Sequence, residues 1–121
     1  MPGLPSIYYG SEWGIEGDKN AGQGDYALRP AIEIEKMDNP ELIDHIKSLA
    51  KIRKSSEALK RGVYEEVQVK NETLVFARVL DDEYAVVALN NTADEKKLVF
   101  DYRGQHYEID LPPHGSKILK N

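Results

Sequence analysis

The chain opens with Met1-Pro2-Gly3-Leu4-Pro5-Ser6-Ile7-Tyr8-Tyr9-Gly10-Ser11-Glu12-Trp13-Gly14, and this stretch decides how the remainder of its 121 residues is interpreted. The apolar residues between Leu4 and Tyr9 do not alternate cleanly with polar ones. Such a run predicts a strand that is covered on both faces, as in a parallel sheet. Nothing earlier in the chain supplies neighbouring strands. We therefore expect residues 1–37 to be the remnant of a larger domain and to be disordered in isolation, because their backbone groups lack partners.

The composition is that of an ordinary globular chain with one or at most two compact units. Hydrophobic residues make up 40% and charged residues 31%, and the formal net charge is −5. No dense cluster of Lys and Arg appears, so no nucleic-acid partner is expected. No apolar run approaches the roughly 20 residues of a membrane span, so no membrane partner is expected either. The absence of cysteine excludes disulfides and thiolate metal sites, and it favours a reducing compartment such as the cytoplasm.

A single helix is predicted over residues 38–61. Asn39 is a good N-cap, Pro40 suits the first helical position, and Gly62 supplies a stop. An apolar stripe follows one side of the helix and consists of Leu42, Ile43, Ile46, Leu49 and Ala50. We expect this stripe to pack on the sheets that follow and to leave part of its surface exposed.

Residues 62–121 are predicted to form a small antiparallel β-sandwich, so the fold class is mainly β with one preceding helix. Short apolar runs recur every 8–12 residues or so, between turn signals. The expected strands cover residues 63–69, 74–80, 84–89, 98–102, 107–111 and 116–119. Val63, Val67 and Val69 are expected to share one face of the first strand. Tyr84 to Leu89 is apolar on both faces, which predicts a central strand.

The opening motif resembles the eighth barrel strand of the α-amylase family of glycoside hydrolases, where Gly-Ile-Pro-x-Ile-Tyr-Tyr-Gly-x-Glu is common. Pro2 to Glu12 carries the resemblance, and Trp13 to Gly17 is similar to the family's continuation. Leu28-Arg29-Pro30 resembles the Arg-Arg-Pro segment of the cyclomaltodextrinase and neopullulanase group, with Leu28 in place of the first Arg. The resemblance implies that residues 1–37 hold barrel strand eight and its rim loop, 38–61 the last barrel helix, and 62–121 the sandwich called domain C.

The resemblance also implies a chemistry for the whole enzyme. Members of this family cleave or transfer the α-glucosidic bonds of starch and maltodextrins with retention, using a nucleophilic carboxylate and an acid roughly 5 Å apart. These carboxyls follow barrel strands four and five, and a third follows strand seven. No residue of this chain matches those positions, so we expect no catalytic residue in it. We also expect no metal site and no cofactor. The implied partners are the missing barrel domain and, for the whole enzyme only, an α-glucan.

Three residues are candidates for the wall of the sugar cleft, because binding groups gather at the C-terminal ends of barrel strands. Glu12 either faces the sugar or is a buried carboxylate that braces a rim loop. Trp13 either stacks on a sugar ring or packs within the loop. Arg29 either donates to sugar hydroxyls or orders a carboxylate through its fixed fork. Tyr8 and Tyr9 are expected in or near a core rather than at a ligand.

The loop from Asp18 to Asp25 carries oxygen-bearing side chains around a glycine, as calcium loops do. Its spacing is shorter than a twelve-residue calcium loop, and its composition is common in flexible segments, so we expect a solvated loop instead. Three scattered histidines, His45, His106 and His114, form no paired metal motif.

Two functions are open for the predicted sandwich. It is either a structural cap on the barrel or a stand-alone carbohydrate-binding module. For the second, Tyr64, Tyr84, Tyr102 and Tyr107 would form a stacking platform. Most of these tyrosines alternate with the apolar set, which favours core packing and the structural cap.

Overall fold

The computed structural model describes residues 3, 5–20, 22 and 24–121. Leu4, Ala21 and Gln23, which belong to the expected strand and loop, lie outside the described residues, as do Met1 and Pro2. The described chain divides into two units, residues 3–52 and residues 53–121, and each is considered by itself. Among the described helices, none has the length and apolar character needed to cross a membrane.

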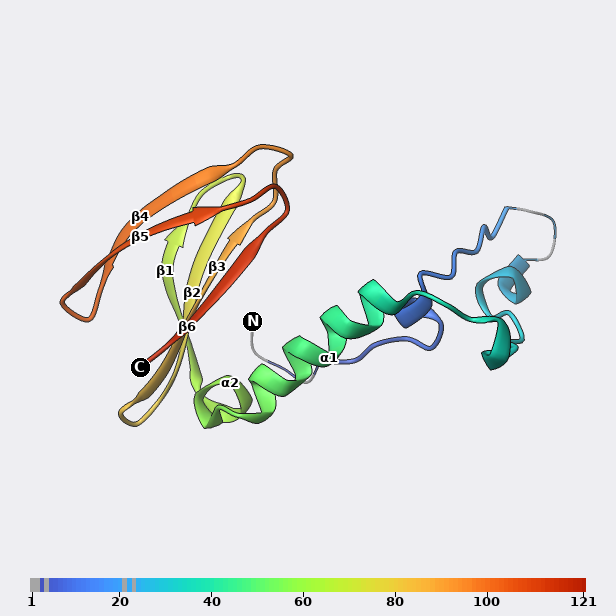
Figure 1. Cartoon of the computed structure of the whole chain (residues 1–121), viewed down its shortest axis with the longest axis horizontal. Helices are drawn as coiled ribbons and strands as arrows, with labels where there is room; N and C mark the ends of the chain where they lie inside the picture. Colours follow the sequence, from blue (N-terminus) through green and yellow to red (C-terminus); the bar gives the residue numbers. More distant parts are fainter. Residues whose placement is uncertain (1–2, 4, 21, 23) are drawn as a thin grey trace. The chain divides into compact units, whose positions relative to one another are not determined.

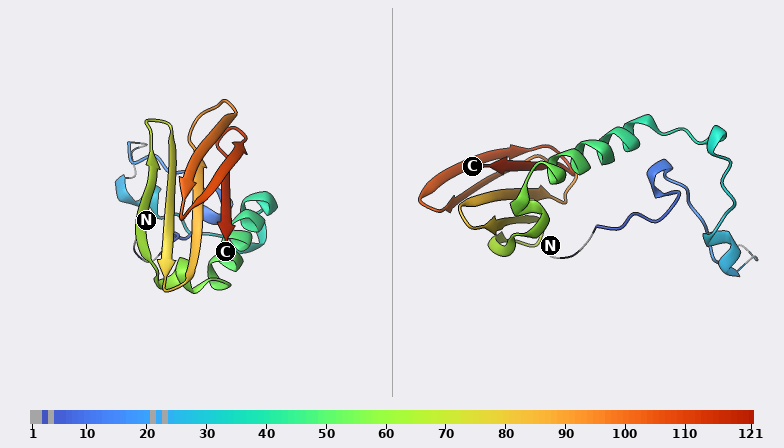
Figure 2. Two further views of the ribbon diagram at one scale, coloured as in Figure 1. Left: turned by 90° about the vertical axis from the view of Figure 1, so that its left-hand side faces the viewer. Right: turned by 90° about the horizontal axis from the view of Figure 1, so that it is seen from below.

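Six antiparallel strands build the unit of residues 53–121 (Figure 1). They are β1 (Val63–Val69), β2 (Thr73–Leu80), β3 (Glu83–Asn90), β4 (Lys96–Tyr102), β5 (Gln105–Leu111) and β6 (Ser116–Lys120). One sheet has the order β1-β2-β3-β6, and β4 and β5 form a second sheet. Figure 2 shows this hairpin lying along the four-stranded sheet. The predicted β-sandwich is confirmed, and β3 is a central strand between β2 and β6, as expected.

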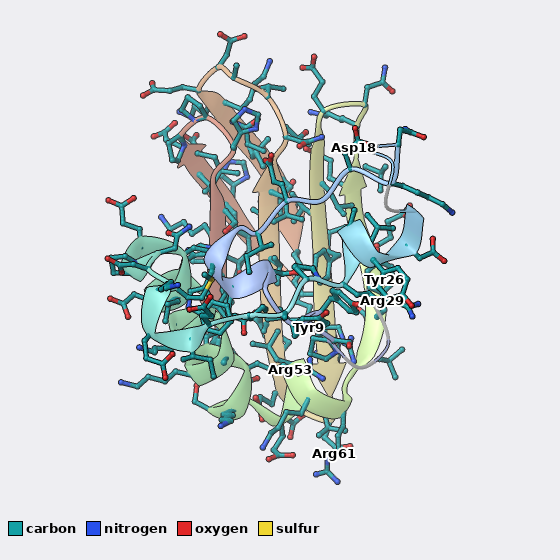
Figure 3. All side chains as sticks on the ribbon, turned by 90° about the vertical axis from the view of Figure 1, so that its right-hand side faces the viewer. Tyr9, Asp18, Tyr26, Arg29, Arg53 and Arg61 are labelled. Atoms are coloured by element: carbon teal, nitrogen blue, oxygen red, sulfur yellow. The ribbon has the colours of Figure 1, made fainter. Side chains whose placement is uncertain are left out.

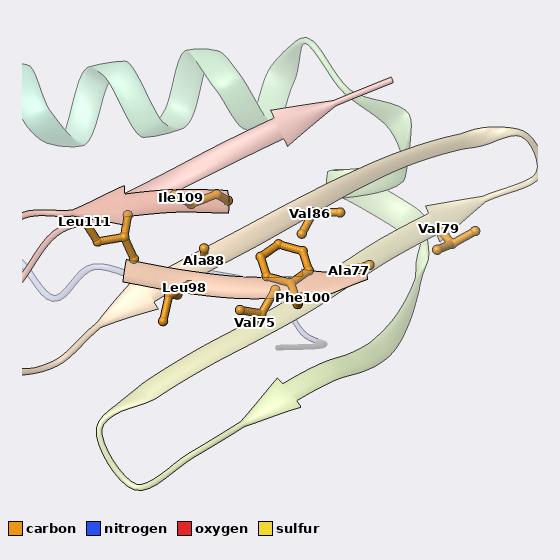
Figure 4. Packing of buried hydrophobic residues seen from close by; sticks show 9 residues of the cluster. All are labelled: Val75, Ala77, Val79, Val86, Ala88, Leu98, Phe100, Ile109 and Leu111. Carbon is orange, nitrogen blue, oxygen red and sulfur yellow. The ribbon is translucent and has the colours of Figure 1, made fainter. Parts of the chain in front are cut away.

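The core lies between the two sheets (Figure 4). Alternate residues of each strand point inward because strand side chains have a period of two. The buried cluster consists of Val75, Ala77 and Val79 from β2, Val86 and Ala88 from β3, Leu98 and Phe100 from β4, and Ile109 and Leu111 from β5. In β4 and β5 the residues at alternate positions, Leu98, Phe100, Ile109 and Leu111, therefore face the core.

The predicted face of β1 is wrong. The register of β1 against β2 shifts between Glu66 and Gln68, so Val67 is an extra residue in the ladder. Val63 pairs with Val79, on the core side, whereas Val69 pairs with Leu74, on the opposite side. Because a bulge reverses which face the following side chains occupy, the three valines do not share one face. Val67 packs against the core, and Val69 is 57% exposed.

The predicted single helix is two helices, α1 (Pro40–Lys54) and α2 (Glu57–Arg61). Ser56 interrupts them: its backbone is extended, and its side chain accepts a hydrogen bond from the backbone N–H of Leu59. The hydroxyl thus starts a second helix rather than continuing the first. The start at Asn39 and the stop at Gly62 agree with the prediction. No residue of α1 is buried, so packing of its apolar stripe stays a prediction.

The unit of residues 3–52 contains three short 3-10 helices before α1. They are η1 (Ser11–Trp13), η2 (Gly24–Leu28) and η3 (Ile34–Lys36). Residues 5–8 have no regular structure, so the expected strand does not form in the described part of this segment. A strand needs neighbours for its backbone groups, and in the described part of the chain no strand pairs with residues 5–8. Ile7 and Tyr8 are each 55% exposed. Disorder of residues 1–37 in isolation stays a prediction.

Candidate functional site

A tight turn after Tyr9 positions Glu12 and Trp13. The carbonyl of Gly10 accepts hydrogen bonds from the backbone N–H groups of Trp13 and Ile15, each at 3.1 Å. Gly10 has a φ of 90° and is buried. A Cβ there would lie 3.1 Å from Ile15 Cδ1, in a backbone region that side chains rarely adopt. Glycine at this position therefore allows η1 to turn sharply and to present Glu12.

Asn39 connects this turn to the start of α1. Its Nδ2 donates to the carbonyl of Trp13 at 3.4 Å, and its Oδ1 accepts from the backbone N–H of Leu42 at 3.3 Å. One side chain therefore caps α1 and holds the backbone of η1. The side chain of Trp13 is half-buried. Its predicted role at a sugar is not tested by this arrangement.

The carboxyl group of Glu12 has an unusual environment. Glu12 is half-buried, and its Oε2 is out of solvent without a hydrogen-bond partner among the described residues. A buried acceptor without a donor costs roughly 1–3 kcal/mol. The brace that we considered for Glu12 would need backbone N–H groups or an Arg as donors, and the described residues provide none to this oxygen.

A second chain reversal brings η2 next to the segment after η1. A Cβ at Gly17 would collide with the backbone carbonyl of Ala27, so the two backbones approach as closely as a glycine allows. This approach creates a hollow of about 440 Å³. It is lined by Tyr8, Tyr9, Ser11, Ile15, Glu16, Gly17, Ala27, Leu28, Arg29 and Pro30.

Tyr8 and Tyr9 form one wall of this hollow. The rings of Tyr8 and Tyr9 are 4.7 Å apart between centroids and inclined by 45°. The hydroxyl of Tyr9 donates to the carbonyl of Pro30 at 3.4 Å. Partial loss of water raises the pKa of Tyr9, its interaction with Tyr8 adds to this, and the positive charge of Arg29 opposes it. The positive charge of Arg29 is therefore close enough to the Tyr9 hydroxyl to affect its ionisation.

A smaller hollow of about 310 Å³ lies beside η2 and is lined by Asp25 and Tyr26 of η2 and by Arg29, which follows it. Figure 3 shows Tyr26 and Arg29 close together. Tyr26 is 84% exposed, the largest exposed fraction among the large hydrophobic residues described as exposed. Sequence reasoning missed Tyr26. The available signal was an aromatic residue between an acid and an arginine three positions later.

The three predicted site residues are not brought into one site by the described structure. Arg29 lines both hollows, whereas neither Glu12 nor Trp13 lines either of them. Their contact with a sugar stays a prediction. The loop of Asp18 to Asp25 has local partners: Asp18 accepts from the N–H of Asn20 at 2.8 Å, and Asp25 pairs with Lys19 at 3.3 Å. Over the described residues, no three His, Asp or Glu side chains are grouped to hold a metal ion.

Three of the four sandwich tyrosines pack against the core, as predicted, whereas Tyr64 stacks on Phe76 outside the core cluster. Tyr84, Tyr102 and Tyr107 are half-buried against the core. The Tyr102 hydroxyl donates to Glu65 at 2.6 Å, and the Tyr107 ring stacks on Phe100 at 5.1 Å. Hydrogen bonding with Tyr84, followed by burial, raises the pKa of Tyr107 to about 12. These three rings contact other side chains of the sandwich and do not form an open stacking platform.

Comparison with known proteins identifies relatives along most of the chain. No protein-family profile matches it. A cyclomaltodextrin glucanotransferase of Klebsiella oxytoca is 35% identical over 104 residues, which cover 79% of this chain and 16% of that enzyme. A cyclomaltodextrinase of Geobacillus thermopakistaniensis is 32% identical over 107 residues, which cover 85% of this chain and 18% of that enzyme. The chain thus spans under a fifth of the length of each of these two relatives.

Solved structures give the same result for the fold. An α-amylase of Anoxybacillus superposes with a TM-score of 0.84 at 26% identity, over 98% of this chain and 29% of that one. A cyclic α-maltosyl-(1→6)-maltose hydrolase of Arthrobacter globiformis superposes with a TM-score of 0.76 at 27% identity, over 95% of this chain and 25% of that one. The homologues and structural neighbours of this chain are therefore α-amylase family enzymes, and the chain is consistent with a C-terminal domain fragment of such an enzyme.

Proposed function

We propose that the chain is the C-terminal portion of a retaining enzyme that acts on α-glucosidic bonds of starch or maltodextrin type. The observation that carries the proposal is its similarity, over about four-fifths of its length, to enzymes named for cyclomaltodextrin conversion. In this proposal the catalytic carboxylates belong to the part of the enzyme that the chain does not include. The chain alone is a structural cap and catalyses no hydrolysis.

The partner in this proposal is a catalytic barrel. Ile7, Tyr8 and Tyr9 are 55%, 55% and 45% exposed, and Leu28 is 41% exposed. Apolar side chains gathered on one segment are typical of a surface that packs against another protein part. In a barrel, neighbouring strands would bury these residues and would supply the backbone ladder that residues 5–8 lack.

Glu12, Trp13 and Arg29 form part of the cleft wall in the proposed enzyme. The support for Glu12 is its solvent-excluded Oε2, which has no donor within the described chain. A donor from the barrel or from a sugar hydroxyl would satisfy it. Arg29 has a planar fork that suits either a carboxylate or a pair of hydroxyls. Trp13 offers an apolar ring face of the kind on which sugar rings stack.

A chimeric enzyme tests the proposal. The segment of the Geobacillus cyclomaltodextrinase that matches this chain is replaced by the chain, and release of reducing sugar from cyclomaltodextrins is measured. We expect the chimera to be active and the chain alone to be inactive. Because Glu12 and Arg29 are proposed to face the cleft, Glu12→Gln and Arg29→Lys are expected to lower kcat/KM by about tenfold or more, which corresponds to roughly 1.4 kcal/mol.

The matched control is Lys51→Gln, a change at an exposed position of α1. It is expected to leave kcat/KM within about twofold. Hydrolysis of starch by the isolated chain would contradict the assignment of the catalytic groups to another part. The proposed function would be contradicted if the chimera folds but is inactive, while the same enzyme with its own segment put back is active.

A further inference from the structure

The smaller hollow on η2 is not explained by packing against a barrel. Among the described residues, it is lined by Asp25, Tyr26 and Arg29, and both Asp25 and Arg29 are charged. The tyrosine ring is 84% exposed. Cores of protein interfaces are depleted of charged residues. A surface made of one exposed ring between a carboxylate and a guanidinium is therefore poorly suited to the centre of a protein contact.

The backbone of η2 fixes the spacing of this cluster. The N–H of Arg29 donates to the carbonyl of Tyr26 at 3.1 Å, so these two residues are held one helical turn apart. Three residues per turn place positions i and i+3 on the same side of a 3-10 helix. Figure 3 shows the two side chains as neighbours. The carboxylate of Asp25, the residue before Tyr26, is paired with Lys19 at 3.3 Å.

This set of groups matches the chemistry of a sugar ring. The apolar face of a tyrosine packs on the C–H face of a pyranose, while its hydroxyl stays in water. The Arg29 fork offers paired donors, and the Asp25 carboxylate accepts from hydroxyls. Small-molecule sites combine an aromatic wall with a few polar groups and have volumes of roughly 300–1,000 Å³. The hollow, at about 310 Å³, is large enough for part of a sugar chain.

The larger hollow also has aromatic rings, the carboxylate of Glu16 and Arg29, and it differs in the apolar residues that make up much of its lining. Two tyrosines, Ile15, Ala27 and Leu28 give it a mostly apolar lining, and Tyr8 and Tyr9 belong to the segment that we propose to enter a barrel. Arg29 is the residue that the two hollows share.

We infer that Asp25, Tyr26 and Arg29 form a sugar-binding subsite for an α-glucan, with Tyr26 as its stacking platform. The inference rests on the proposed function for the choice of an α-linked glucan. The subsite includes Arg29, one of the three proposed wall residues, whereas Glu12 and Trp13 do not line its hollow.

Because residues 1–37 are expected to be ordered only against a barrel, the subsite is tested in the chimeric enzyme, which is titrated with a thio-linked maltoheptaose that it cannot hydrolyse while the amide NMR signals of the inserted chain are followed. We expect shifts at Asp25, Tyr26 and Arg29. Tyr26→Ala is expected to weaken binding about tenfold, since a ring contact of about 1.4 kcal/mol is lost. Tyr26→Phe keeps the ring face and is expected to stay within about twofold. Because Tyr26 is so exposed, neither change threatens folding.

Two controls sharpen the result. Tyr8→Ala changes a comparable ring in the larger hollow and is expected to leave maltoheptaose affinity unchanged. Cellohexaose presents the same sugar with β linkages and is expected to bind at least about fivefold more weakly, because linkage changes which ring faces and hydroxyls reach the groups. Equal binding of cellohexaose would overturn the assignment to an α-glucan.

Other outcomes would overturn the subsite itself. Unaltered affinity of Tyr26→Ala would do so, as would shifts confined to the sandwich, or no shifts at all. Concentration-dependent shifts at Tyr26 without sugar would assign the surface to a second copy of the chain. The activity of the chimeric enzyme is an independent measurement. An active chimera together with a failed titration rejects the subsite alone, whereas the reverse pattern rejects the proposed enzyme.

Discussion

Ser56 donates its hydroxyl hydrogen to Oε1 of Glu83 at 2.5 Å, which joins the start of α2 to the beginning of β3 across 27 residues of sequence. The same carboxylate oxygen accepts from the backbone N–H of Ala58 at 3.2 Å. The Ser56 oxygen accepts in turn from the N–H of Leu59 at 3.1 Å. Two side chains thus satisfy donors at the first turn of α2, where a helix has no partners of its own. This junction fixes α2 against the sandwich.

Removal of the cap should destabilise the chain. Ser56 is 2% exposed, so Ser56→Ala leaves a buried helix start and the Glu83 carboxylate with fewer partners. We expect the free energy of unfolding to fall by about 1–2 kcal/mol, the usual cost of a lost N-cap. Urea unfolding measures it. Ser55→Ala, at the exposed neighbour, should change stability by less than about 0.5 kcal/mol. Equal effects at the two serines would contradict this role for the cap.

The junction also predicts a dependence on pH. Hydrogen bonds from Ser56 and then from the N–H of Ala58 lower the pKa of Glu83 in the folded chain. A carboxyl whose folded pKa is lowered stabilises the fold above its ordinary pKa, and this stabilisation is lost as pH falls through the folded value. Wild type and Glu83→Gln are compared by urea unfolding between about pH 7 and pH 3. Their difference in stability should shrink toward low pH, and a constant difference would refute the prediction.

Much of the sandwich follows from local pattern alone. Apolar residues at alternate positions in β4 and β5 and turn residues between strands depend only on near neighbours. The break at Ser56 could not be predicted in this way, because the carboxylate that stabilises it is 27 residues distant. The face of Val69 could not be predicted for a related reason. One extra residue in the ladder, Val67, moves the side chains that follow it to the opposite face of the sheet.

The candidate site was less accessible to sequence reasoning. The family resemblance pointed to Glu12, Trp13 and Arg29 through their distance from the expected strand. The hollow beside Tyr26 depends on the 3-10 turn that places Arg29 next to it, and no pattern in the sequence specifies that turn. Resemblance therefore located the segment, and the backbone geometry located the exposed ring.

Two adjacent residues of β4 test the assignment of the core. Phe100 is 6% exposed and stacks on Tyr107, whereas Val99 is 43% exposed on the other face. Phe100→Ala should lower the free energy of unfolding by about 3–5 kcal/mol, because it leaves a cavity between the sheets. Val99→Ala should cost less than about 1 kcal/mol. Chemical denaturation gives both values, and similar losses would mean that the strand faces are wrong.

Asn90 holds together the loop between β3 and β4. Its Nδ2 donates to the carbonyls of Asp94 and Pro112 at 2.8 and 2.9 Å, and its Oδ1 accepts from the N–H and the hydroxyl of Thr92 at 3.0 and 2.8 Å. Asn90 is 4% exposed. Asn90→Ala leaves several buried groups unpaired and should cost about 2–4 kcal/mol.

The neighbouring Asn91 is exposed and provides the matched control. Asn91→Ala should change stability by less than about 0.5 kcal/mol. Amide hydrogen exchange adds a local readout, because the N–H of Thr92 should lose protection in Asn90→Ala and keep it in Asn91→Ala. Retained protection in the first variant would show that the loop does not depend on this side chain.

His106 on β5 offers a test of surface electrostatics. Its Nδ1 lies 2.7 Å from Oδ1 of Asp101, which faces it across the hairpin, and its Nε2 lies 3.8 Å from Glu108, itself paired with Lys97. The hydrogen bond and charge of Asp101 are the main causes that raise the pKa of His106 above 6.5, and Glu108 adds to them. A raised folded pKa means that the pair stabilises the fold below the unfolded pKa and that this contribution disappears as pH rises through the folded value.

In an NMR titration, Asp101→Asn should bring the pKa of His106 back toward its ordinary value, because both main causes are removed. Asp82→Asn, in the turn between β2 and β3, should leave it unchanged. An unaltered His106 titration in Asp101→Asn would show that the pair is not formed in solution.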